Sequence, residues 1–134
     1  MKTSKLTRAA FVALAGFAMV GPKTALADIK DYEFRLVQPT VQVGSDRVVT
    51  VQLLNKMTGK PVPGAVIFAT RLDMAPDAME EMVTKVTPVP ARESGSYSFK
   101  ARFSMEGRWQ LSLGAKVQGE TGTVENKLVI TAQK

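Results

Sequence analysis

Apolar and polar residues alternate without a break in the stretch that decides the fold, Tyr97-Ser98-Phe99-Lys100-Ala101-Arg102-Phe103, and again in Trp109-Gln110-Leu111-Ser112-Leu113-Gly114-Ala115-Lys116-Val117. A period of two is typical of a β-strand with one buried side and one solvent-facing side. Glu106-Gly107 separates the two runs and marks a turn. These segments therefore predict two neighbouring strands, with Trp109 packed inside.

Further strands are predicted on both sides of this pair. They cover residues 32–36, 47–54, 65–69 and 124–131, with turn residues concentrated in 55–64, 94–96 and 119–122. The run 65–69 is apolar throughout, which favours a central strand covered on both faces. About seven short strands in about 100 residues indicate an all-β fold, an immunoglobulin-like β-sandwich.

One segment departs from the strand pattern and predicts a short helical insertion. Residues 73–82 lack β-branched side chains and contain Pro76, which is tolerated in a first helical turn. Asp77 and Glu80 have the spacing of a capping box. We expect this helix to join two strands at the surface or at one end of the sandwich.

The amino terminus has the layout of a secretory signal peptide. A basic segment, an apolar run over residues 9–20 and the sequence Ala25-Leu26-Ala27 follow one another. The alternative is a retained anchor, although 12 apolar residues span only about 18 Å as a helix. We expect a leader over 1–27, cleavage after Ala27 and a single exported, periplasmic domain over 28–134, with no membrane span after cleavage.

Removal of the leader would lower the net charge of the protein. The whole chain has a formal net charge of +6, but four of its 18 basic residues lie in the leader, leaving 14 basic against 12 acidic residues. A net charge of +2 without a basic run gives no reason to expect a nucleic-acid partner.

The side chains available restrict the chemistry. The sequence contains neither Cys nor His, which excludes disulfides, Cys/His zinc sites and nucleophile–histidine catalysis. A hydrolase would need a pair of perturbed carboxylates, but the acidic residues near 73–81 are also explained by a capped, solvated helix. We expect no catalytic residues and a protein that is not an enzyme.

Methionines are the most informative residue type. Met74, Met79 and Met82 lie within nine residues, and in the predicted helix Met79 and Met82 share a face. A thioether is a soft, neutral ligand that suits Cu(I). Met105 joins them as a ligand only if its turn lies at the same end of the sandwich. Core packing and a flexible partner-binding patch are the alternatives for these residues.

The sequence also resembles the YtkA-like and FixH-like periplasmic domains. The resemblance rests on four motifs, Thr58-Gly59-Lys60-Pro61-Val62-Pro63-Gly64-Ala65, Asp73-Met74-x-Pro76-x-x-Met79-x-x-Met82, Gly95-x-Tyr97-x-Phe99 and Met105-x-Gly107-x-Trp109-x-Leu111. It implies a small immunoglobulin-like sandwich, exported or tethered, that accompanies copper efflux systems or the assembly of haem–copper oxidases. Two departures are a leader that looks cleavable, unlike the FixH anchor, and the lack of His, which leaves Cu(I) rather than Cu(II).

Together these observations predict a periplasmic accessory protein that holds or transfers Cu(I) through Met74, Met79 and Met82, with Met105 as a further candidate. Its partner would be an envelope transporter or an oxidase-assembly protein. The alternative is an interaction module of the same kind of complex that binds no metal.

Overall fold

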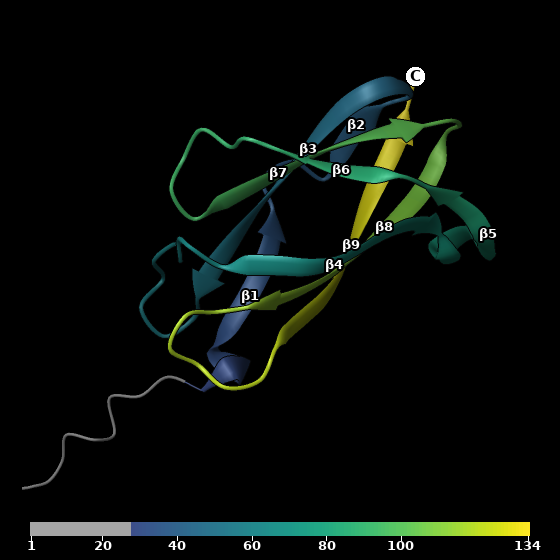
Figure 1. Cartoon of the computed structure of the whole chain (residues 1–134). Coiled ribbons are helices and arrows are strands. Elements are labelled where there is room, and N and C mark those ends of the chain that lie inside the picture. Colours follow the sequence, from purple (N-terminus) through teal and green to yellow (C-terminus); the bar gives the residue numbers. More distant parts are fainter. Residues whose placement is uncertain (1–27) are drawn as a thin grey trace, which may run out of the picture.

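In the computed structural model, which describes residues 28–134, nine strands form two sheets that pack against each other (Figure 1). The strands are β1 Tyr32–Leu36, β2 Thr40–Gln42, β3 Gly44–Asn55, β4 Val66–Met74, β5 Met79–Thr84, β6 Val86–Val89, β7 Ser96–Phe103, β8 Gly107–Lys116 and β9 Val124–Gln133. Two short 3-10 turns accompany them, η3 Ile29–Asp31 and η4 Ala75–Asp77. The predicted all-β, immunoglobulin-like sandwich is thus confirmed, with more strands than the seven expected.

The two sheets have the strand orders β1-β3-β7-β6 and β2-β9-β8-β4-β5, and we call them sheet A and sheet B. Neighbouring strands are antiparallel except β2, which runs parallel to β9. The chain passes from sheet A to sheet B between β1 and β2, next to Pro39, which has no backbone N–H to donate.

The core lies between the sheets and follows the alternation of the sequence. Trp109 and Phe103 pack edge to face with ring centroids 5.5 Å apart. Their strands also bury Phe99, Ala101, Leu111, Leu113 and Ala115, and every one of these residues lies on the apolar phase of the alternation. Trp109 is a core residue, as predicted.

Two local predictions are wrong. The 65–69 run is not covered on both faces, because Val66 and Phe68 in β4 remain more than half exposed on the outer side of sheet B. The predicted helix over 73–82 is absent as well. Its residues form the end of β4, the single 3-10 turn η4 and the start of β5.

The predicted leader over 1–27 and the cleavage after Ala27 lie outside the described residues. Within residues 28–134, no helix has the length and apolar character required to cross a bilayer.

Candidate functional site

The candidate methionines lie at the end of the sandwich where β4 turns into β5. Met74 is the last residue of β4 and Met79 is the first residue of β5. The two are direct partners across the antiparallel pair. Directly opposite residues have Cβ atoms about 5 Å apart, so their side chains leave the backbone side by side.

Met74 is fully buried and reaches toward the β7–β8 turn. Its terminal methyl carbon lies only 2.5 Å from the position that a Cβ atom would take at Gly107. Gly107 also has a φ of +141°, which a residue with a side chain rarely adopts. The glycine therefore leaves the space that the thioether of Met74 occupies.

Met79 and Met82 are partly buried and pack against the core, but not for the reason that the sequence indicated. They were expected on one helix face, whereas in a regular strand residues three apart point to opposite sides. The pairing between β4 and β5 shifts register between Asp73 and Met74, which inserts extra residues into β5. This irregularity lets both methionines face the interior.

Met105 lies in the turn between β7 and β8, at the same end as Met74 and Met79. It is 40% exposed, and its carbonyl oxygen accepts a hydrogen bond of 3.2 Å from Nε1 of Trp109. The condition for including Met105 in the site, a turn at the same end, is therefore met.

An aspartate and an arginine position the chain as it leaves β4. Asp73 is only 4% exposed, and its carboxylate accepts hydrogen bonds from Nε of Arg71 at 2.6 Å and from the backbone N–H of Ala75 at 3.0 Å. Arg71 also donates to the carbonyl oxygen of Glu80 in β5 at 3.1 Å. These bonds fix the β4–η4–β5 connection.

A second pair holds η4 against β8. The Asp77 carboxylate accepts the backbone N–H of Arg108 at 2.7 Å and its Nε at 2.8 Å, while Pro76 accepts from the same guanidinium. Hydrogen bonds from the backbone and then from the side chain of Arg108 lower the pKa of Asp77 below its ordinary value. Asp77 therefore clamps β8, and the expected capping box with Glu80 does not form, because Glu80 lies in β5.

The arrangement offers soft sulfur donors next to carboxylates that are already occupied by arginines. Among residues 28–134, no three acidic side chains gather in a way that would hold a metal ion. We refer to Met74, Met79, Met82 and Met105 as the methionine end.

The residues that shape this end could not be predicted from local sequence. Arg108 pairs with Asp77 across 31 positions, so no local spacing indicates the contact. The sequence predicts Gly107 only as a turn residue. Its second role, to leave space for Met74, depends on the packing of β4 against β8.

Known proteins provide an independent comparison. The model of a family described as YtkA-like matches residues 26–114. A filamin domain of Lin-41 shares 18% identity, with 77% of this chain and 92% of the other covered and a TM-score of 0.46. The C-terminal domain of ZirS shares 12% identity, with 94% and 85% covered and a TM-score of 0.44. No curated protein matches. With two thirds of its length matched by the family model, the chain belongs to the YtkA-like family.

Proposed function

We propose that this protein is a non-catalytic, periplasmic accessory protein that holds Cu(I) at the methionine end and passes it to a partner. The single observation that carries the proposal is the direct cross-strand pairing of Met74 with Met79. Two soft donors that leave adjacent strands side by side need only small side-chain rotations to share one ion.

The exposure of the methionines supports a route for the ion. Met74 is fully buried, Met79 and Met82 are half-buried, and Met105 is exposed at the neighbouring turn. In this proposal Met105 captures the ion from solvent, Met74 and Met79 retain it, and Met82, three residues farther along β5, is a further donor. Thioethers suit this task because they are neutral and because protons do not compete with the ion for the sulfur.

The surroundings of the ion would be apolar on the inner side. Met74 belongs to the core that contains Trp109 and Phe103. A monovalent ion with uncharged ligands is costly to bury, so the partly buried Met79, which retains some exposure to solvent, is the favourable place for it. The partner in this proposal is an envelope copper transporter or an oxidase-assembly protein that takes the ion from the exposed side.

A Cu(I) titration against a competing chelator tests the proposal, with the purified protein kept under reducing conditions. The variant M74L/M79L removes both central sulfurs and preserves bulk, at a cost of less than about 1.5 kcal/mol per site. We expect its affinity to fall by more than roughly tenfold, since even outer-shell changes cost a metal site that much.

Met57 provides the matched control. It lies in the loop after β3, at the opposite end of the sandwich, and is 74% exposed. M57L should bind Cu(I) like the wild type. If M74L/M79L, M57L and the wild type bind equally, whether tightly or weakly, the methionine end is not a copper site.

A further inference from the structure

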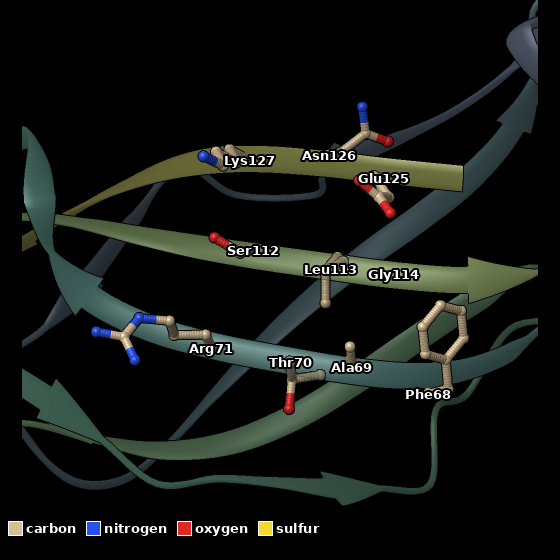
Figure 2. Close-up of a pocket in the computed structure, with 10 residues that line it drawn as sticks. All are labelled: Phe68, Ala69, Thr70, Arg71, Ser112, Leu113, Gly114, Glu125, Asn126 and Lys127. Carbon is tan, nitrogen blue, oxygen red and sulfur yellow. The ribbon is translucent and has the colours of Figure 1, made fainter. Parts of the chain in front are cut away.

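A hollow of about 440 Å³ lies on the outer face of sheet B, on the side away from the core (Figure 2). Strands β4, β8 and β9 form its floor and walls. The residues that matter here are Phe68 and Arg71 from β4, Ser112 and Gly114 from β8, and Glu125 and Lys127 from β9. None of them belongs to the methionine end.

A glycine and an aromatic ring form the apolar part of the hollow. A bulge between Ile67 and Ala69 turns Phe68 to the outer face, where its ring reaches toward Gly114, as Figure 2 shows. The ring atoms approach the missing Cβ position of Gly114 to 3.2 Å, and Phe68 remains 55% exposed. Phe68 thus covers part of the glycine and still presents an aromatic surface to solvent.

A row of cationic and hydroxyl side chains forms the polar part. Ser112 is the direct cross-strand partner of both Arg71 and Lys127, so the two cations flank the hydroxyl. Arg71 is held by Asp73 and by the carbonyl oxygen of Glu80, whereas Lys127 has no ion-pair partner within residues 28–134. Lys127 is therefore the cation available to a ligand.

The next cross-strand row, Ala69-Gly114-Glu125, lies two residues farther along the strands. Two residues of extended chain span about 6.7 Å, so the polar and apolar parts are separated by the distance between alternate residues of an extended peptide. Glu125 borders the apolar part and would repel an acidic group there. The charges thus place an anionic group of a ligand at Lys127 and an apolar group of the same ligand at Phe68.

We propose that this hollow docks an extended segment of a partner protein in which an acidic residue precedes or follows an aromatic residue by two positions. The carboxylate pairs with Lys127 and accepts a hydrogen bond from Ser112, while the aromatic side chain lies over Gly114 against Phe68. Val66 and Val129 face outward on the same sheet and extend the apolar surface around the segment. Aromatic residues such as Phe68 are enriched in the centres of protein–protein interfaces.

The test is an NMR titration of the isotope-labelled protein with the peptide acetyl-Ala-Glu-Ala-Phe-Ala-amide, without any metal. We expect saturable shifts confined to the amides of β4, β8 and β9 around Gly114. Replacing Glu by Gln in the peptide should weaken binding about three- to fivefold, as expected for an exposed charge pair, and added salt should remove this difference. Replacing Phe by Ala in the peptide should weaken binding further.

Substitutions of two exposed lysines provide a test variant and its control. K127M should reproduce the effect of the Gln peptide, and K100M, at an exposed position of sheet A, should change nothing. The proposal is overturned if no saturable shifts occur, if the Glu and Gln peptides bind equally, or if K127M and K100M behave alike. It is also overturned if inorganic phosphate produces the same shifts at the same concentration, because the hollow would then be a plain anion site.

Discussion

At the scale of single residues, Gly107 does more than allow the chain to turn. It adopts a φ of +141°, and a Cβ atom there would lie 2.5 Å from the methyl of Met74 and 2.8 Å from Oδ2 of Asp77. One missing side chain therefore permits the turn, the buried thioether and the carboxylate clamp together.

Gly107→Ala should lower the free energy of unfolding by about 2 to 4 kcal/mol, because backbone strain and overpacking add. Gly119→Ala is the control, since Gly119 has a φ of +85° but no atoms within 4 Å of its Cβ position. Backbone strain alone should lower the free energy of unfolding of Gly119→Ala by about 1 kcal/mol. Urea unfolding compares the two variants, and equal losses would contradict the contact with Met74.

Asp77 makes the stability of the folded protein depend on pH. Its pKa is lowered in the folded protein by the hydrogen bonds from Arg108, so its stabilising effect is present above the unfolded pKa of about 3.9. The effect is lost as the pH falls through the folded pKa. Asp77→Asn should therefore be less stable than the wild type at pH 7, and the difference should shrink below about pH 3. Unfolding midpoints across this range measure it; a difference that persists unchanged in acid would contradict the clamp.

At the scale of elements, the sequence predicts the strands well and the 73–82 segment poorly. Alternation reports burial directly, so the strands that contain Phe99 and Leu111 could be read from local pattern alone. Helix propensity is a weaker signal. It is outweighed where β5 pairs with β4 and where Arg71 and Arg108 bind the carboxylates of the turn.

The candidate site, like the strands, can be predicted from the sequence only in part. The sequence predicts Met74, Met79 and Met82 as site residues because they are close in the chain. The inward orientation of both Met79 and Met82, however, depends on a register shift, and the position of Met105 at the same end of the sandwich depends on the way β8 pairs with β4. Neither can be derived from spacing. The hollow around Gly114 could not be predicted either, because an apolar run such as 65–69 indicates burial on both faces, whereas Val66 and Phe68 are exposed.

The hairpin formed by β4 and β5 should open when its buried carboxylate is removed. Asp73→Ala leaves the N–H of Ala75 and the guanidinium of Arg71 without their acceptor, at a cost of about 1 to 3 kcal/mol. Amide hydrogen exchange should accelerate in β5, while the pairing of β1 with β3 stays protected. Uniform acceleration in both sheets would show that Asp73 does not act locally.

At the scale of the whole molecule, two features lie on different parts of the sandwich. The methionine end closes one end of the core, and the hollow lies on the outer face of sheet B (Figures 1 and 2). Met105 and the β7–β8 turn are not part of the lining of the hollow, so a segment that is docked in the hollow alone would leave Met105 accessible. Docking and ion transfer could then occur in one complex.

The most direct test of the copper proposal is a spectrum of the protein labelled with ¹³C at its methionine methyl groups, recorded before and after one equivalent of Cu(I). A coordinated sulfur changes the shift of its own methyl group, so each thioether reports for itself. The account predicts that the signals of Met74 and Met79 move together, that Met105 responds, and that Met57 does not. Unmoved signals for Met74 and Met79, or a response only from Met57, would contradict it.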